Sequence, residues 1–201
     1  MNKAFIMLVA LAMVAVGASA QTTLLGFAGY GQSAFDLDEA FGEDVTEDQA
    51  GYIPVGAEIL VELSPGLSVG AEVDYAVVPF TWEFEYAGET VGEVKVTQMV
   101  LGGLARFEMG QGSLRPHVRG GAGLYMGKSK SEPEQGADTE EDFKNAFGFN
   151  VGAGLTADFG ETKIWMLEFV YHIVSREADV EGAESFGANN WALHLGAGMK
   201  F

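Results

Sequence analysis

The 201-residue chain contains no cysteine, few prolines and few basic residues. The lack of cysteine excludes disulfide bonds and thiolate metal sites. Beyond the N-terminal segment no run approaches the roughly 18 consecutive apolar residues of a transmembrane helix. Only 11 Lys and Arg stand against 29 Asp and Glu, which gives a formal net charge of -18. Such a chain repels nucleic acid, so nucleic-acid partners are excluded.

Helix-forming stretches are also scarce. The chain has 28 glycines but only 5 prolines, so a collagen-like repeat is excluded and a disordered chain is disfavoured. Glycine and β-branched residues interrupt nearly every window in which a helix could form. The composition therefore favours a single, strand-rich domain.

The N-terminus has the layout of a secretory signal peptide. Met1-Asn2-Lys3 is a short positive start, residues 4–17 form an apolar run, and residues 18–20 read Ala-Ser-Ala, a small-x-small cleavage site. The apolar run is too short to cross a bilayer as a helix. We therefore expect a cleaved signal peptide over residues 1–20 and one mature domain over 21–201. No Cys follows the cleavage site, so a lipoprotein is excluded.

Alternation of apolar and polar residues marks eight segments of the mature domain as strands. We expect them at residues 22–35, 52–63, 67–77, 94–108, 114–126, 145–159, 163–176 and 191–201. The connections near residues 64, 110 and 161 are short. The other connections are longer and polar, at residues 36–51, 81–93, 128–144 and 177–190. Short turns on one rim and long loops on the other are typical of an up-and-down membrane barrel.

The last predicted strand carries a family resemblance. On one of its faces it presents Trp191, Leu193, Leu195, Ala197, Met199 and Phe201. Apolar residues in alternation before a terminal Phe resemble the C-terminal strand of bacterial outer-membrane β-barrels. Residues 22–201 resemble the OmpA-type and OmpX-type small barrels, with a local echo in the run Arg-Pro-His-Val-Arg-Gly-Gly-Ala-Gly-Leu at 115–124.

The resemblance implies an all-β fold, an eight-stranded antiparallel up-and-down transmembrane β-barrel integral to the outer membrane of a Gram-negative cell. It implies outer-membrane lipid as the surroundings, and the barrel-assembly machinery and periplasmic chaperones as partners during biogenesis. The assembly signal would be formed by Trp191, Leu193, Leu195, Met199 and Phe201.

Alternation alone does not separate a membrane barrel from a soluble one, since the two have opposite faces inside. The apolar faces of the predicted strands carry almost no charge, as contact with lipid demands. Aromatic residues lie towards the strand ends, which suggests two interfacial girdles. They are Phe107, Phe159, Trp165 and Phe201 near the short turns, and Tyr75, Phe147, Tyr171 and Trp191 near the loops. The glycine-rich polar faces suit a narrow interior, so the membrane barrel is favoured.

The polar faces predict a charge network inside the barrel. Counting back from the Ser64-Pro65-Gly66 turn places Glu58 opposite Glu72, and two adjacent carboxylates need a cation or a shared proton. Arg106 and Arg119 lie at similar depth on neighbouring predicted strands. An eight-stranded barrel is just wide enough for side chains, and an unpaired buried charge is costly. We therefore expect these four residues to form a salt-bridged plug that stops free passage of solutes.

The acidic residues concentrate in the predicted long loops, which hold 21 of the 29 Asp and Glu. These loops could bind divalent cations or surface ligands, although a solvated surface is the simpler interpretation. The run Asp36-Leu37-Asp38-Glu39 lacks the Gly and final Glu of an EF-hand. No cofactor and no metal site are expected.

A catalytic site is not expected either. Glu168 and His172 share a face, but Ser175 falls on the opposite one, and the His-x-Ser motif of small lipid A deacylase barrels is missing. We predict a structural or surface-interaction role for a plugged barrel. The alternatives are a narrow porin-like channel for small or cationic solutes and an outer-leaflet lipid-modifying enzyme.

Overall fold

The computed structural model describes residues 21–34, 50–86, 89–133, 139–177 and 185–201, and these form eleven strands. None of the described residues forms a helix that could cross a membrane. The predicted signal peptide and the Asp36–Glu39 run lie outside the described residues.

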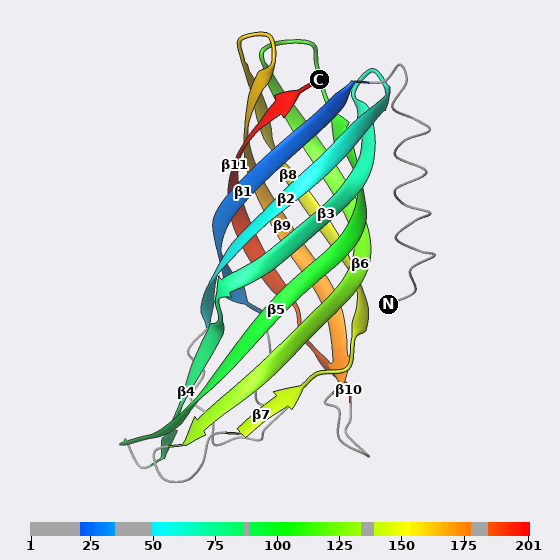
Figure 1. Cartoon of the computed structure of the whole chain (residues 1–201). Helices are drawn as coiled ribbons and strands as arrows, with labels where there is room; N and C mark the ends of the chain where they lie inside the picture. Colours follow the sequence, from blue (N-terminus) through cyan, green and yellow to red (C-terminus); the bar gives the residue numbers. More distant parts are fainter. Residues whose placement is uncertain (1–20, 35–49, 87–88, 134–138, 178–184) are drawn as a thin grey trace.

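Eight of the strands close into an antiparallel barrel (Figure 1). They are β1 (Thr22–Ser33), β2 (Gly51–Ser64), β3 (Leu67–Val78), β5 (Glu89–Glu108), β6 (Leu114–Pro133), β8 (Ala146–Phe159), β9 (Lys163–Glu177) and β11 (Asn190–Lys200). Each pairs with the next along the chain, and β11 pairs with β1 from Thr23–Lys200 to Ser33–Asn190. The expected eight-stranded antiparallel barrel is confirmed.

Three tight turns join neighbouring strands at the rim shown at the top of Figure 1. Gly66, Gly110 and Gly160 occupy these turns with φ angles of 83°, 89° and 78°, a conformation that favours glycine over other residues. We refer to this end of the barrel as the short-turn rim and to the opposite end as the loop rim.

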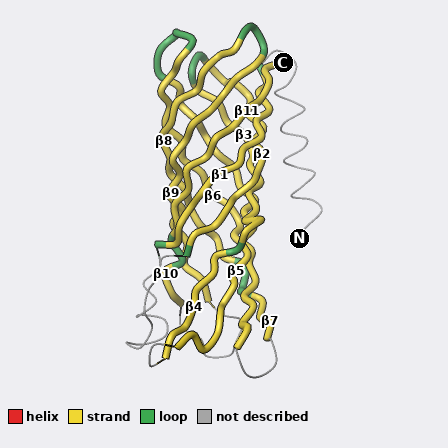
Figure 2. Tube along the Cα trace, turned by 90° about the vertical axis from the view of Figure 1, so that its left-hand side faces the viewer, coloured by secondary structure: helices red, strands yellow, loops and turns green. Residues whose placement is uncertain are grey.

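The prediction of long loops is wrong over much of their length, because these segments form further strands. β4 (Phe80–Tyr86) pairs with β5 and fills most of the expected 81–93 loop, while β6 continues to Pro133 and pairs with β7 (Thr139–Asp142). β10 (Ser185–Gly187) pairs with β9. These strands lack the apolar face on which the sequence prediction depended. In water the antiparallel hydrogen-bond ladder continues without an apolar outer face. The four-stranded sheet β4–β5–β6–β7 therefore projects beyond the barrel, which we call the extension (Figures 1 and 2).

The two faces of the barrel strands have opposite character. The interior buries charged and polar side chains such as Glu58, Arg119 and Glu168, whereas many large apolar side chains are exposed on the outside. Three of the aromatic residues predicted near the short turns are at strand ends and 49% or more exposed: Phe107, Phe159 and Phe201. On β1, whose phase the sequence left open, Leu25 and Phe27 are buried while Leu24 is exposed. An exposed apolar belt around a polar interior is the arrangement of a membrane barrel.

Candidate functional site

The middle of the barrel interior holds a cluster of charged side chains from four strands. Glu58 on β2 is paired in register with Glu72 on β3, and Arg106 on β5 with Arg119 on β6. All four side chains point inward and are between 1% and 4% exposed. The structure thus brings together the four residues that the sequence selected.

Both arginines bridge the carboxylates. Arg119 donates through Nη1 to Glu58 Oε1 at 2.6 Å and through Nη2 to Glu72 Oε2. Arg106 donates through Nη2 to Glu58 Oε2 at 2.7 Å. Glu58 therefore accepts from both guanidinium groups, one on each carboxylate oxygen, and Arg119 bridges the adjacent pair Glu58 and Glu72.

Three further residues belong to the same cluster, in addition to the four predicted for the plug. Glu168 on β9 accepts from Arg119 at 3.1 Å and from Arg106 at 3.2 Å, and His117 Nε2 lies 2.8 Å from Glu168 Oε2. Asn150 on β8 donates to Glu72 Oε1 at 2.7 Å. We call these seven residues the central network: Glu58, Glu72, Arg106, His117, Arg119, Asn150 and Glu168.

Apolar side chains fill the interior around the central network. One buried cluster lies beside the network, where Met166 contacts Arg106: Leu25, Phe27, Leu60, Leu104, Ile164 and Met166. Nearer the loop rim they form two clusters, which include Tyr52, Phe80, Val96, Val100, Tyr125 and Val174. Charged side chains buried this deeply are shielded from water, which strengthens their ion pairs and makes each unpaired charge costly.

Glycines give the long charged side chains room. A Cβ built on Gly121 would lie 2.7 Å from Asn150 Oδ1, and one on Gly152 would lie 3.0 Å from Arg119 Cγ. A Cβ on Gly102 would come within 3.4 Å of Glu72 Oε1. The glycine-rich inner face is therefore part of the geometry of the central network, because larger residues would displace it.

Replacing one of these glycines should destabilise the barrel, while its outward neighbour should tolerate the same change. We expect Gly121→Ala to lower the free energy of unfolding by about 1–3 kcal/mol, since it overpacks against Asn150. Gly120 has no atom within 4 Å of a built Cβ, so Gly120→Ala should be neutral or slightly stabilising. Urea titration of both variants in lipid vesicles measures the difference, and equal stability of the two would contradict the packing described here.

A second group of polar side chains lies between the central network and the loop rim. Tyr125 Oη is 3.0 Å from His172 Nδ1, and Tyr52 donates to Asn190 Oδ1 at 2.9 Å. His194 stacks on Phe27 with a ring separation of 4.4 Å. These contacts are those of buried, packed polar groups.

The residues weighed as a catalytic set do not converge. Glu168 is occupied by Arg106, Arg119 and His117, and His172 is buried in the interior. Ser175 is exposed on the opposite face of β9, so it cannot form a nucleophile–base pair with His172. Within the described part of the chain, no group of three or more His, Asp or Glu side chains is placed to hold a metal ion.

The extension carries ion pairs in water. Lys95 contacts Glu132 at 2.7 Å and Glu93 at 2.9 Å, and Lys130 contacts Glu132 at 2.6 Å. The ammonium groups of Lys130 and Lys95 lower the pKa of Glu132 to about 2. Because exposed pairs of this kind contribute little stability, they define the charge pattern of the surface more than its folding.

Known outer-membrane proteins share this fold. The family model described as "Outer membrane protein beta-barrel domain" matches residues 6–201. Neisserial surface protein A is similar in fold, with a TM-score of 0.60 at 12% identity over 90% of this chain and 97% of that one. OprG from Pseudomonas aeruginosa gives a TM-score of 0.54 at 15% identity, covering 90% and 96% of the two chains.

Ail, the attachment invasion locus protein of Yersinia pestis, gives a TM-score of 0.52 at 13% identity, covering 90% of this chain and 99% of that one; its crystal structure is a complex with the heparin analogue sucrose octasulfate. At these identities the likeness shows the fold alone. No curated protein matches the chain.

Proposed function

The chain belongs to the outer membrane protein β-barrel domain family and is an integral outer-membrane protein, and from this premise we propose that it is a plugged barrel with a structural or surface-interaction role. In this class of barrel the short turns face the periplasm and the long connections face the outside of the cell. The extension, formed by the long connections, is then the part of the molecule that meets other surfaces.

The observation that carries this proposal is the central network. Seven buried side chains from six strands meet across the interior, and clusters of buried apolar side chains fill much of the rest of it. A hydrated solute would have to separate buried ion pairs to pass, which costs several kcal/mol for each broken pair. A free-diffusion channel does not fit this interior.

Single-channel recording in planar bilayers tests the plug. We expect the refolded wild-type protein to show no large, stable pore, because the ion pairs of the central network close the interior. Insertion is checked separately by the heat-dependent shift in gel mobility that membrane barrels usually show. A large, long-lived conductance step from inserted wild-type protein would refute the plug and favour the narrow porin-like channel for small or cationic solutes.

The proposal extends to biogenesis. Residues 1–20 would direct export and be removed, and periplasmic chaperones and the barrel-assembly machinery would deliver the chain to the membrane. The outward face of the closing strand would be the assembly signal, since Leu193, Leu195, Met199 and Phe201 are 46% or more exposed. Mass spectrometry of protein from the outer-membrane fraction would show whether the mature chain starts at Gln21.

A further inference from the structure

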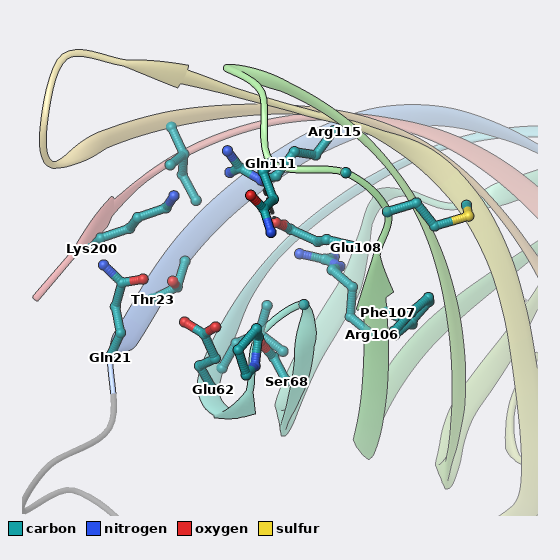
Figure 3. Close-up of a pocket in the computed structure, with 16 residues that line it drawn as sticks. Gln21, Thr23, Glu62, Ser68, Arg106, Phe107, Glu108, Gln111, Arg115 and Lys200 are labelled. Atoms are coloured by element: carbon teal, nitrogen blue, oxygen red, sulfur yellow. Dashed lines mark hydrogen bonds and ion pairs between the residues drawn. The ribbon is translucent and has the colours of Figure 1, made fainter.

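The short-turn rim opens into a cavity that the central network closes from within (Figure 3). Its volume is about 670 Å³, which is within the range of small-molecule sites. Turn residues such as Pro65, Gly66 and Gln111 form its mouth, and Arg106 lines it. We call it the vestibule. It opens towards the periplasm, as short turns do in this class of barrel.

Opposite charges lie on one wall of the vestibule, two strands apart. Glu62 on β2, Ser68 on β3 and Arg106 on β5 are consecutive partners in the strand register, so they form one row across three strands. Two strand spacings separate the backbones of Glu62 and Arg106 by about 10 Å. Figure 3 shows the carboxylate and the guanidinium on the two sides of Ser68.

Glu62 and Arg106 are not fully paired within the described part of the chain, unlike the other charged residues of the vestibule. Arg115 is paired with Glu108 and with Asp158, and Lys200 with Asp158. Glu62 has no ion-pair partner among the described residues.

Arg106, which is 2% exposed, uses Nη2 for the central network, while its Nε has no hydrogen-bond partner in the described part of the chain. A buried guanidinium with a free donor is costly unless an acceptor reaches it.

The remaining lining fits a small apolar body. Leu60 and Ile164 form a buried apolar part of the wall, and the hydroxyl-bearing Thr23 and Ser68 lie on β1 and β3, the strands on either side of β2. A molecule with an ammonium group towards Glu62, a carboxylate towards Arg106 and a short apolar side chain would match each part of this surface. A lone anion would lie near the unpaired Glu62, and a lone cation would leave the donor of Arg106 unused.

We propose that the vestibule binds small zwitterions of the amino-acid type from the periplasmic side. The proposal does not depend on the surface-interaction role, since the vestibule and the extension lie at opposite ends of the barrel (Figure 1). In this arrangement Glu62 and Arg106 bind the two charges of one ligand, and the central network forms the closed end of the site.

Nuclear magnetic resonance of isotope-labelled protein in lipid nanodiscs tests this inference with three probes: L-alanine, ethylamine and propionate. We expect alanine to cause saturable shifts in amide signals around Glu62, Ser68 and residues 108–111, with the signals of the extension unchanged. Ethylamine and propionate each lack one charge, so each should bind at least about tenfold more weakly. Equal responses to all three probes, or no saturable response to alanine, would overturn the proposal.

Two variants and one control assign the response to the vestibule. Glu62→Gln should weaken alanine binding about tenfold or more, and Ser68→Leu should abolish it by filling the space between the charges. Glu161→Gln removes the same charge from an exposed turn at the same rim, outside the vestibule, and should bind like the wild type. Unchanged binding by a folded Glu62→Gln variant, verified by its heat-dependent gel shift, would rule out the assigned site.

Discussion

Replacing Arg119 by alanine should lower the free energy of unfolding by about 3–5 kcal/mol, since it removes one partner from a buried ion-pair cluster. Arg119 donates to Glu58, Glu72 and Glu168, all of which stay buried when it is gone. Arg106 reaches Glu58 and Glu168, but the structure gives it no contact with Glu72. Urea-induced unfolding in lipid vesicles, followed by tryptophan fluorescence, measures the loss.

Two companion variants test whether the loss comes from the central network. Arg119→Lys keeps the charge but cannot contact Glu58 and Glu72 with a planar fork, so its stability should fall between wild type and alanine. Lys128→Ala removes a cation from the exposed pair with Glu140 and should cost at most about 1 kcal/mol. A cost for Arg119→Ala no larger than for Lys128→Ala would mean that the central network does not hold the interior together. In planar bilayers, Arg119→Ala should also raise any small conductance.

Placing an arginine on the outer face should be destabilising in proportion to depth in the bilayer. The pairing of β9 with β8 runs from Lys163 to Val174, and Phe169 lies near its middle with a side chain 46% exposed. We expect Phe169→Arg to lower the free energy of unfolding by about 2–4 kcal/mol, because a charge at the midplane of the bilayer loses its hydration.

The matched control is the same substitution at the end of a strand. Phe159 is the last residue of β8 and is 70% exposed at the short-turn rim. Phe159→Arg should cost only about 0–1 kcal/mol, since a side chain at the interface reaches water. Equal costs at the two positions, measured by unfolding in the same vesicles, would indicate that the outer face of β9 is not in contact with the hydrocarbon.

The strand order and the inward faces could be predicted from the sequence because period-two alternation survives wherever one face meets lipid. Val55, Ala57 and Ile59 alternate with Glu58, and this pattern fixes both the strand and the side that enters the interior. β1 lacks this contrast. Leu24 and Leu25 occupy both phases, with glycines at 26, 29 and 31, so only the pairing with β2 and β11 determines that Phe27 points inward.

The extension could not be predicted because the rule that reveals strands in lipid does not apply in water. Backbone pairing holds the extension together: β4 pairs with β5, β5 with the outer half of β6, and β6 with β7. Within the central network, counting residues along the sequence identifies only neighbours across a single hairpin, such as Glu58 and Glu72. Glu168 contacts arginines two and three strands away around the barrel, and such contacts across the interior depend on barrel closure, which no local pattern specifies.

The seam between β1 and β11 has a consequence for the order of folding. Thr22 and Phe201 exchange backbone hydrogen bonds, so β1 pairs with a strand that lies at the other end of the sequence. Contacts between residues so distant in sequence form late and slowly, because a large loop must first be closed. Until the last strand arrives, the open sheet has two unprotected edges, and intermediates are therefore exposed to aggregation unless other proteins shield them.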